Sequence, residues 1–562
     1  MRVAVAQLDP IVGDLDGNAA AIRRAAETAA EDGAEILVTS ELALVGYPPR
    51  DLLERPGLAE ACLAHAEAIG RAAPGLTIVV GLPRRVSGDP RPLRNSAAIV
   101  RGGRIAGYAD KRLLPSYDVF DEDRFFSPGG DGFAFEHRGR RVGVALCEDL
   151  WQAQDAGGVR RYRDDPVGDL AAGGLDLLLV PSASPFVRGK HRRHLAILSA
   201  AAARFRTTIV SVNQVGANDE LVFDGGSAVV GADGRVRHRL DRLREGVATI
   251  ETDLAGCAAA GPDEREGDED LGELFEAIVC GIRGYVRKSG HERVLLGVSG
   301  GIDSAVVAAL AAAAVGPDRV RGVMMPSRHS SEGSLVDARA TASALRLGRL
   351  DRLPIEPVHA AFADGLAAAI GTPEGVADEN LQSRIRGTML MAIANTTGEL
   401  LLATGNKSEY AVGYSTLYGD MNGGLAPIGD VLKTDLVALA RWMNRRHREL
   451  GFEEPPIPHA SIEKPPSAEL RPDQTDQDSL PPYPVLDAVV RGWVEQGVPA
   501  EAIAAEIGRP VGFVRDLGRL IDRQEFKRKQ APPILKTSPR AFGRGRPMPL
   551  AWRWNPGAPS SG

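Results

Sequence analysis

Short runs of apolar and β-branched residues recur through residues 1–254 and alternate with stretches of helical periodicity. The runs are Val3–Ala6, Ile36–Thr39, Thr77–Val80, Ala97–Val100, Val142–Leu146, Leu175–Val180, Thr208–Val212 and Ala228–Val230. Such regular alternation is typical of an α/β domain with a large central sheet. The pattern therefore predicts one α/β domain over residues 1–254.

The pattern changes at residues 255–270, which lose periodicity and become acidic and rich in Gly and Pro. This composition predicts a linker. Beyond it we expect a helix over about Leu271–Lys288 and a second α/β series with strands at Val320–Met324 and Leu400–Thr404. A second domain is therefore predicted over residues 271–562.

Two stretches of the second domain have no clear periodicity. Residues 455–484 are rich in Pro, Asp, Gln and Ser, which favours a loop over a core element. The tail after Ser538 is rich in Arg, Gly and Pro, and we expect it to be loosely held.

The composition is that of a globular protein, with 44% hydrophobic and 25% charged residues in a chain of 562. A net charge of -7 offers no general electrostatic reason to bind nucleic acid or an acidic membrane. The longest apolar run, Ala305–Val315, is too short to span a bilayer, and no secretion signal precedes the first strand. Four widely spaced cysteines suggest neither a disulfide framework nor a zinc site, which favours a reducing cytoplasm.

The segment Ser299-Gly300-Gly301-Ile302-Asp303-Ser304 follows an apolar strand and opens an alanine-rich helix. Glycines let the backbone approach an anion closely, and N–H groups at a helix start present partial positive charge to it. The segment lacks the ending of a Walker loop and the spacing of a dinucleotide fingerprint. An ordinary glycine turn is the alternative, but the paired Gly, flanking Ser and following Asp favour a pyrophosphate cradle and ATP chemistry.

This segment resembles the signature loop of the N-type ATP pyrophosphatases, which cleave ATP between the α- and β-phosphates and adenylylate a substrate. The resemblance implies an ATP-binding loop in which Asp303 also holds a magnesium ion. Its residues are Gly297, Val298, Ser299, Gly300, Gly301, Ile302, Asp303 and Ser304.

Three chemically reactive residues of the first domain each follow a predicted strand: Glu41, Lys111 and Cys147. Strand ends in open α/β sheets are where active sites are usually assembled. A thiol attacks a carbonyl carbon well only when a base or cation supports it. Taken singly, the cysteine would be core filler and the two charges solvated surface groups; together they are a plausible set for cleaving an amide.

Their local sequences resemble the nitrilase superfamily in three motifs that occur in the family's order. The motifs are Ser40-Glu41-Leu42 with Gly46-Tyr47-Pro48, Asp110–Pro115 with Lys111, and Leu146-Cys147-Glu148-Asp149. The resemblance implies a four-layer αββα fold in which Glu41 is the general base, Cys147 the nucleophile, and Lys111 stabilises the tetrahedral intermediate. Glu148 could assist or be structural.

By similarity to glutamine-using members, the substrate residues are Tyr117, Ser184 and Lys190. The basic cluster at residues 190–194 has an alternative interpretation as an exposed helix face.

Three stretches of the second domain resemble the NAD synthetase family: residues 378–387, 402–409 and 525–533. The resemblance implies a Rossmann-like parallel α/β domain that binds ATP and deamido-NAD at the sheet edge. It assigns Thr404 and Lys433 to ATP, Asp303 and Glu409 to magnesium, and Asn380, Arg384, Glu409 and Lys527 to deamido-NAD. Singly, Arg384, Lys433 and Lys527 would be taken for surface cations. Leu417 and Gly424 stand where the resemblance leads us to expect a lysine and an aspartate.

Over nearly the whole chain the two halves together resemble the glutamine-dependent NAD synthetases. The resemblance implies an oligomeric enzyme that activates the nicotinate carboxylate of deamido-NAD with ATP and amidates it with ammonia from glutamine, releasing AMP and pyrophosphate. One alternative is a nitrilase-type glutaminase fused to an adenylating amidotransferase with another acceptor. Another is a ligand-sensing pseudoenzyme, which would be expected to have lost Cys147, Lys111 or the Ser-Gly-Gly loop.

Overall fold

The computed structural model of the protein describes residues 1–89, 91–151, 162–253 and 268–553. The chain divides into two compact units, Met1–Arg265 and Glu266–Gly562. Residues 255–267 of the predicted linker (residues 255–270) lie outside the described residues. Helix α6 (Asp268–Lys288) begins at the next residue, within the last three positions of the predicted linker. None of the helices in the described ranges has the length and apolar character needed to cross a membrane.

The first unit holds two six-stranded sheets, ordered β14-β1-β2-β3-β4-β5 and β13-β12-β9-β8-β7-β6. The strands of the first sheet are β1 (Arg2–Gln7), β2 (Ile36–Thr39), β3 (Thr77–Arg85), β4 (Leu93–Arg101), β5 (Arg104–Asp110) and β14 (Gly246–Glu251). Those of the second are β6 (Phe133–His137), β7 (Arg140–Val144), β8 (Leu177–Ser182), β9 (Thr208–Asn213), β12 (Ala228–Val230) and β13 (Val236–Arg239). A hairpin of β10 (Val215–Asn218) and β11 (Leu221–Asp224) forms a separate small sheet.

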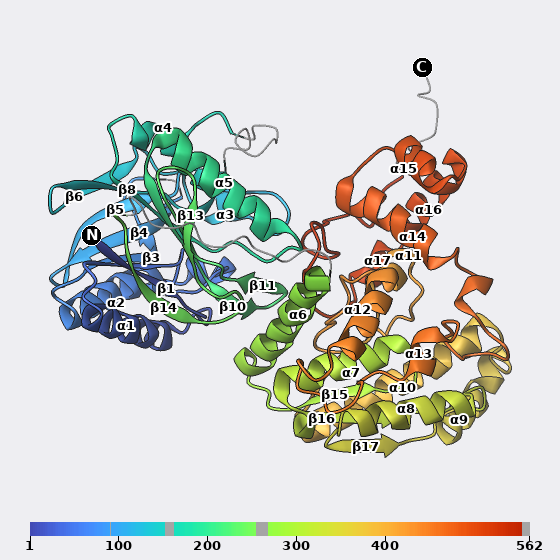
Figure 1. Ribbon diagram of the computed structural model, residues 1–562. Coiled ribbons are helices and arrows are strands. Elements are labelled where there is room, and N and C mark those ends of the chain that lie inside the picture. The colour runs from blue at the N-terminus through green and yellow to red at the C-terminus, as the bar shows by residue number, and fades with distance from the viewer. Residues whose placement is uncertain (90, 152–161, 254–267, 554–562) are drawn as a thin grey trace. The chain divides into compact units, whose positions relative to one another are not determined.

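Helices cover the outer face of each sheet, so this unit has four layers (Figure 1). Helices α1 (Leu15–Glu31) and α2 (Leu58–Ala72) lie on the first sheet, and α4 (Pro166–Ala171) and α5 (Lys190–Phe205) lie on the second. Alternate residues of β1 face opposite ways: Val3 and Val5 pack between the sheets, while Ala4 and Ala6 pack against the helices. Both faces are buried, which explains the continuous apolar runs and confirms the expected αββα sandwich.

The second unit is built on a four-stranded parallel sheet ordered β17-β16-β15-β18. Its strands are β15 (Val294–Gly297), β16 (Val320–Met324), β17 (Arg349–Arg352) and β18 (Leu400–Leu401). Helices α6, α7 (Ile302–Val315) and α12 (Lys433–Arg445) pack on one face, and α10 (Val376–Thr397) packs on the other. The arrangement confirms the expected Rossmann-like parallel α/β domain.

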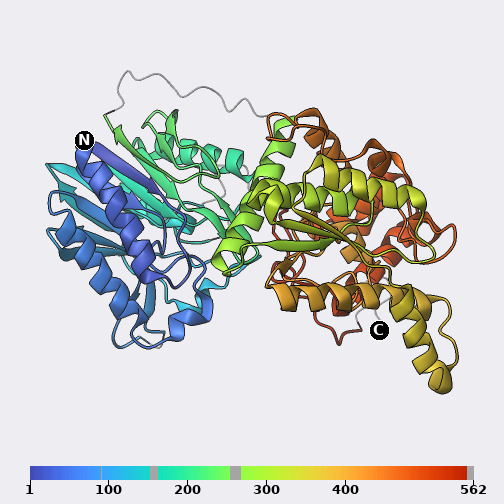
Figure 2. The same cartoon turned by 90° about the horizontal axis from the view of Figure 1, so that it is seen from below.

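Four further helices of this unit connect or flank the sheet. They are α8 (Glu332–Ala344), α9 (Glu356–Ile370), α11 (Lys407–Val412) and α13 (His459–Glu463). In Figure 2, α9, drawn in olive, extends away from the sheet of its unit. A helical region with its own apolar cluster follows, formed by α14 (Tyr483–Val490), a π-helical turn (Arg491–Gln496), α15 (Ala500–Ile507), α16 (Val511–Arg523) and α17 (Glu525–Arg528).

The tail after Ser538 is more firmly packed than its composition suggests. Phe542 is buried against the guanidinium of Arg528, and Arg546 is buried in an ion pair with Asp522. The expectation of a loosely held tail is therefore wrong up to Arg546, because these Arg side chains have buried partners far away in the sequence. Residues 554–562 lie outside the described part of the chain.

Element boundaries differ from the prediction where strands are short or polar. The predicted strand at Leu400–Thr404 ends at Leu401, because Leu402 makes only an isolated bridge to Leu425. The polar strand β13 lacks an apolar run and was not predicted; neither was β6, in which only the three residues Phe133–Phe135 are apolar. Most of residues 455–484 is irregular, as predicted, although α13 and several buried side chains lie within it.

Candidate functional site

The three candidate catalytic residues of the first unit lie where strands of both sheets end. Glu41 and Lys111 follow β2 and β5 of the first sheet, and Cys147 follows β7 of the second. Cys147 opens a 3-10 turn (Cys147–Leu150) with a φ of 40°, a backbone region that L-residues rarely occupy. A side chain on Gly81 of β3 would collide with the backbone of Ser40, so only glycine permits the close packing beside Glu41.

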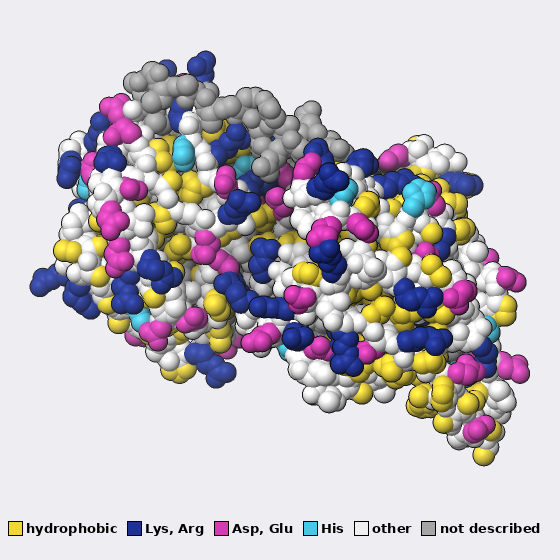
Figure 3. All heavy atoms as spheres, turned by 60° about the horizontal axis from the view of Figure 1, so that its bottom comes forward, with side chains coloured by type: hydrophobic (Ala, Val, Ile, Leu, Met, Phe, Trp, Pro, Cys, Tyr) yellow, Lys and Arg dark blue, Asp and Glu magenta, His cyan; other side chains and the backbone are white. Residues whose placement is uncertain are grey.

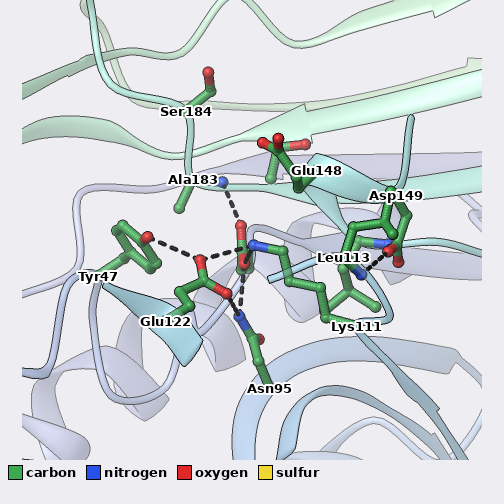
Figure 4. Close-up of polar contacts among 12 residues, drawn as sticks. Tyr47, Asn95, Lys111, Leu113, Glu122, Glu148, Asp149, Ala183 and Ser184 are labelled. Carbon is green, nitrogen blue, oxygen red and sulfur yellow. Dashed lines mark hydrogen bonds and ion pairs between the residues drawn. The ribbon is translucent and has the colours of Figure 1, made fainter. Parts of the chain in front are cut away.

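Lys111 is the centre of a buried ionic cluster (Figure 4). Its Nζ lies 2.7 Å from Oε1 of Glu41 and 2.7 Å from Oε1 of Glu122, which belongs to the short helix α3 (Glu122–Phe125). All three side chains are buried. Two carboxylates hold this buried ammonium in a fixed position. A fixed ammonium can stabilise negative charge that develops on a reacting group.

Neutral donors hold the two carboxylates in place. The Nδ2 of Asn95 donates to Oε1 of Glu41 at 2.6 Å and to Oε2 of Glu122 at 3.2 Å. The backbone N–H of Ala183 donates to Oε2 of Glu41 at 3.1 Å, and the Tyr47 hydroxyl donates to Oε1 of Glu122 at 2.9 Å. These bonds leave each carboxylate little freedom to rotate.

The charges of the cluster shift its proton affinities. Burial and the nearby charge of Glu41 raise the pKa of Glu122 to about 7, although Lys111 opposes the shift. Burial disfavours the ammonium of Lys111, but the two carboxylates outweigh it and raise the pKa of Lys111 well above its usual value. Lys111 therefore stays charged while Glu122 is poised to exchange a proton.

The Cys147 thiol is protonated at rest. Burial and the negative charge of Glu41 raise its pKa, while Lys111 lowers it in part. A buried thiol of this kind becomes a nucleophile only when a base takes its proton as it attacks. Asp149 links this turn to the Lys111 loop, because it accepts from the backbone N–H groups of Leu113 at 2.8 Å and Leu146 at 3.1 Å.

One of the candidate glutamine residues, Tyr117, contacts a buried carboxylate next to Cys147. Glu148 accepts from the hydroxyl of Tyr117 at 3.0 Å and from that of Tyr162 at 2.8 Å. Ser184 lies at the start of the loop after β8 and donates its N–H to Asn213 at 2.8 Å.

Lys190, the first residue of α5, donates to the carbonyl of Pro185 at 3.0 Å and lies 5.6 Å from the ring of Trp151. His191 and His194 of the same cluster are buried, so residues 190–194 are not simply an exposed face.

In the second unit, the glycine-rich loop joins β15 to the start of α7. Gly300 has a φ of +79°, and a side chain there would meet the carbonyl oxygen of Ser334, so the position requires glycine. The hydroxyls of Ser299 and Ser304 lie 3.1 Å apart, and the N–H of Gly301 donates to Oγ of Ser299. The loop thus presents hydroxyls and N–H groups at the carboxyl end of the central strand, where open α/β sheets bind ligands.

A second charged cluster lies beside this loop. Lys433, the first residue of α12, places its Nζ 2.5 Å from Oδ2 of Asp303 and 3.4 Å from Oε1 of Glu409. The Nδ2 of Asn406 donates to the other oxygen of Asp303 at 2.7 Å. Burial and the charge of Asp303 raise the pKa of Glu409 to about 8, while Lys433 lowers it in part. Thr404 is half-buried between β18 and α11.

Three of the candidate deamido-NAD residues converge on the loop at residues 413–420. Asn380 of α10 accepts from the Thr416 hydroxyl at 2.8 Å, and Nε of Arg384 donates to the Leu417 carbonyl at 3.1 Å. Lys527 of α17 donates to the carbonyls of Gly413 and Ser415 at 2.6 and 2.7 Å. Glu409 instead faces the Asp303–Lys433 cluster.

Gly424 leaves no carboxylate at the position where we expected an aspartate, and a side chain there would meet Leu400. Within the described ranges, no group of three or more His, Cys, Asp or Glu residues is arranged to hold a metal ion.

Sequence reasoning missed Glu122 and Asn95, which complete the first cluster. Glu122 stands in the acidic run Asp121–Asp123, and Asn95 lies within a strand. Neither has a local sequence signal that separates it from a surface polar residue, so only the packing of distant segments identifies them.

Two family models match the chain. The carbon-nitrogen hydrolase model matches residues 2–261, and the NAD synthase model matches residues 274–531.

Individual relatives match over nearly the full length. The chain is 43% identical to the glutamine-dependent NAD(+) synthetase of Synechocystis sp., with 99% of each chain covered, and 42% identical to that of Xylella fastidiosa (strain Temecula1), with 98% of each covered. Among solved structures, glutamine-dependent NAD+ synthetase from Acinetobacter baumannii in complex with ADP matches with a TM-score of 0.76 at 34% identity, covering 98% of both chains.

Proposed function

The chain belongs to the family of glutamine-dependent NAD(+) synthetases, and we propose that it amidates deamido-NAD with ammonia that it releases from glutamine at the cost of ATP. The observation that carries the proposal is the presence, in one chain, of a buried Glu41–Lys111 pair beside a cysteine and of a glycine-rich phosphate loop beside Lys433. The first set suits amide cleavage, and the second suits a reaction of ATP.

In the first unit, Glu41 takes the proton of Cys147 as the sulfur attacks the side-chain amide carbon of glutamine. Negative charge then develops on the carbonyl oxygen, and Lys111 stabilises it. Glu41 then passes the proton to the amide nitrogen, the C–N bond breaks, and ammonia leaves, so a thioester to Cys147 remains. Water hydrolyses the thioester and releases glutamate.

Glutamine is an α-amino acid, so its recognition requires a group of each charge besides the catalytic set. Glu148 supplies a buried carboxylate for the α-ammonium group, and Lys190 supplies an ammonium for the α-carboxylate. Tyr117 orients Glu148 through their 3.0 Å hydrogen bond. Ser184, which follows Ala183 in the chain and is buried, is the third residue that we assign to glutamine.

In the second unit, the loop at residues 297–304 and Lys433 bind the phosphates of ATP, with Thr404 at the adjacent strand end. The nicotinate carboxylate of deamido-NAD, held by Asn380, Arg384 and Lys527, attacks the α-phosphate and displaces pyrophosphate. Ammonia then attacks the carbonyl carbon of the adenylate, and AMP leaves. Cations are needed because two polyanionic ligands must approach each other.

Asp303 and Glu409 fit a divalent cation bound together with the nucleotide. Magnesium is usually held by one or two carboxylates, water and phosphate oxygens, so the two side chains suffice without a third protein ligand. Burial, together with the nearby carboxylate of Asp303, raises the pKa of Glu409. When bound, magnesium would offset charge on the phosphates.

The proposal includes two domains, a glutaminase over residues 1–254 and a synthetase over residues 271–562, and a homo-oligomeric state. An oligomer is supported by α9, whose only buried residue is His359. Val358, Phe362 and Ile370 are exposed there, and yellow hydrophobic side chains gather on this projecting end in Figure 3. Exposed apolar patches of this kind mark interaction surfaces. A cytoplasmic location is proposed because the buried thiols of Cys62 and Cys147 are free.

The test is to incubate the protein with deamido-NAD, ATP and magnesium, supply either glutamine or ammonium, and follow NAD and AMP. We expect one NAD and one AMP per turnover with both nitrogen sources. Absence of NAD with either source would refute the proposed function.

A further inference from the structure

Asp476 is a buried acidic residue in the segment at residues 455–484, which the sequence suggested to be a loop. Its side chain is only 3% exposed. The segment is anchored beside the phosphate loop, because the hydroxyl of Ser461 donates to the Gly300 carbonyl at 2.9 Å. Glu469 accepts from the Ser334 hydroxyl at 2.6 Å, next to the same glycine.

One carboxylate oxygen of Asp476 has a partner and the other has none. The Tyr483 hydroxyl donates to Oδ2 at 2.7 Å. Oδ1 is buried and has no hydrogen-bond partner at normal distance in the described ranges, although the Tyr414 hydroxyl also interacts with the Asp476 carboxylate. Since an unsatisfied buried acceptor is costly, Oδ1 is expected to meet a donor when ligands are bound.

Asp476 faces the cluster of Asp303, Glu409 and Lys433. Its negative charge contributes to the raised pKa values of both Glu409 and Lys433. The ring of Tyr483, its hydrogen-bond partner, lies 5.4 Å from Nζ of Lys433. Three carboxylates thus act on the one ammonium group of Lys433.

The three carboxylates do not converge on a point where one ion could bind all of them, since the described residues hold no such metal-binding group. Asp476 is therefore placed for an indirect role. Magnesium retains several water molecules when it is bound through one or two carboxylates and phosphates. Residues that accept hydrogen bonds from such ligands position them and strengthen metal binding.

We propose that Asp476 is a positioning residue of the nucleotide site, whose Oδ1 accepts a hydrogen bond from a water molecule on the magnesium ion held by Asp303 and Glu409. The inference rests on the proposed function, because it assumes that this ion accompanies the nucleotide. It gives residues 455–484, which are anchored beside the phosphate loop, a role in metal binding.

The test compares Asp476→Asn with the wild-type protein in binding a non-hydrolysable ATP analogue, measured by calorimetry over a magnesium titration and in EDTA. We expect the magnesium concentration at half-saturation to rise about tenfold or more, while binding in EDTA is unchanged. The same rise should appear when manganese binding is followed by electron paramagnetic resonance. Asp473→Asn is the matched control, because it removes an exposed carboxylate of the same segment.

Other outcomes would overturn the inference. Equal weakening with magnesium and in EDTA would mean that Oδ1 contacts the nucleotide itself. No change in either condition, or an equal effect in Tyr483→Phe, would mean that Asp476 only supports the packing of Tyr483. Asp303→Asn and Glu409→Gln distinguish a failure of the proposed metal site from a failure of the role of Asp476. If these two variants leave the magnesium dependence of nucleotide binding intact, the metal site itself is refuted.

Discussion

At the scale of single residues, both proposed sites consist of a lysine shared by two carboxylates, with neutral donors around them. Lys111 lies between Glu41 and Glu122, and Lys433 lies between Asp303 and Glu409. In each cluster, burial and a neighbouring carboxylate raise the pKa of one acidic side chain, Glu122 or Glu409, above its ordinary range.

Replacing Glu122 with Gln should impair only the use of glutamine. Lys111 would lose one of its two ionic partners and its fixed position, so we expect glutamine-supported NAD synthesis to fall about 100-fold. Ammonium-supported synthesis should be unchanged. Both are measured as initial rates, with the exposed Glu136→Gln as control. An unaltered glutaminase rate would show that Glu122 does not position Lys111.

Glu409 should make the protein without ligands less stable as the pH rises. Its pKa is raised from 4.5 to about 8 in the folded state. At pH values between 4.5 and about 8, Glu409 is therefore protonated in the folded protein and ionised in the unfolded chain. The resulting stabilisation is present at low pH and is lost as the pH rises through about 8.

Glu409→Gln removes this titration. In urea unfolding without nucleotide, the variant should gain stability relative to the wild-type protein between about pH 5 and pH 8.5. Glu374→Gln, which alters an exposed carboxylate, should show no such trend. If the difference in the free energy of unfolding between Glu409→Gln and the wild-type protein does not vary with pH, the raised pKa of Glu409 is contradicted.

At the scale of elements, buried ionic contacts fasten the C-terminal segment to the start of α11. The Nζ of Lys407, with no exposed surface, lies 2.8 Å from Asp430 and 2.5 Å from Glu495, and donates to the Ser538 hydroxyl at 2.7 Å. Asp430 also accepts from the backbone N–H groups of Thr537 and Ser538, each at 2.7 Å. These contacts explain why the tail is ordered although its composition suggests otherwise.

Lys407→Met should release this segment. It removes the Lys407 ammonium from the buried Asp430, on which Lys536 still acts, and from the half-buried Glu495; breaking such a buried ion pair costs about 3–5 kcal/mol. We expect a matching loss in the free energy of unfolding and faster tryptic cleavage after residue 536. Lys529→Met, at an exposed lysine, is the control. The double variant Lys407→Met/Asp430→Asn should be more stable than Lys407→Met alone, because it removes the unpaired charge of Asp430. If it is no more stable, the unpaired charge does not cause the loss of stability.

At the scale of the whole molecule, the two units have separate cores and separate chemistry. Among the described residues, the apolar clusters of the sandwich contain none from the parallel α/β unit, and neither charged cluster includes one of the other unit. Each reaction should therefore be removable by itself.

Cys147→Ala should abolish glutamine-supported synthesis, by at least about 1,000-fold, and spare ammonium-supported synthesis. Asp303→Ala should abolish NAD formation with both nitrogen sources while glutaminase activity survives. NAD and glutamate are measured in parallel for both variants. Loss of ammonium-supported synthesis in Cys147→Ala would mean that Cys147 is structural.

Phe362→Asp should disrupt the proposed oligomer, because it places a charge in the exposed apolar surface of α9. Light scattering coupled to size-exclusion chromatography should show a smaller species than the wild-type protein. The control is Leu550→Asp, at an exposed apolar residue outside α9. If Phe362→Asp and Leu550→Asp form species of the same molecular mass, α9 does not lie in the interface of the proposed oligomer.

The sequence by itself determined the fold class and the motifs whose chemistry is local. Continuous apolar runs such as Ile36–Thr39 arise because both faces of a strand are buried, and the glycines of the phosphate loop record a backbone that approaches an anion. Glu41 and Cys147 could be found because they follow such strands, whereas Lys111 follows the more polar β5 and was found through its local motif.

Only the tertiary structure decided which distant polar residues complete the sites. Glu122, Asn95 and Asp476 have no local signal, since a polar residue in an acidic run, a strand or a loop is ordinarily solvated. Their significance comes from burial beside Lys111 or Lys433, which distant strands and loops bring together. The ordered tail is the same case: Lys407 and Asp430 hold it through contacts that span more than 100 residues of chain. Charge pairing in a buried site depends on distance in space, and sequence spacing does not encode it.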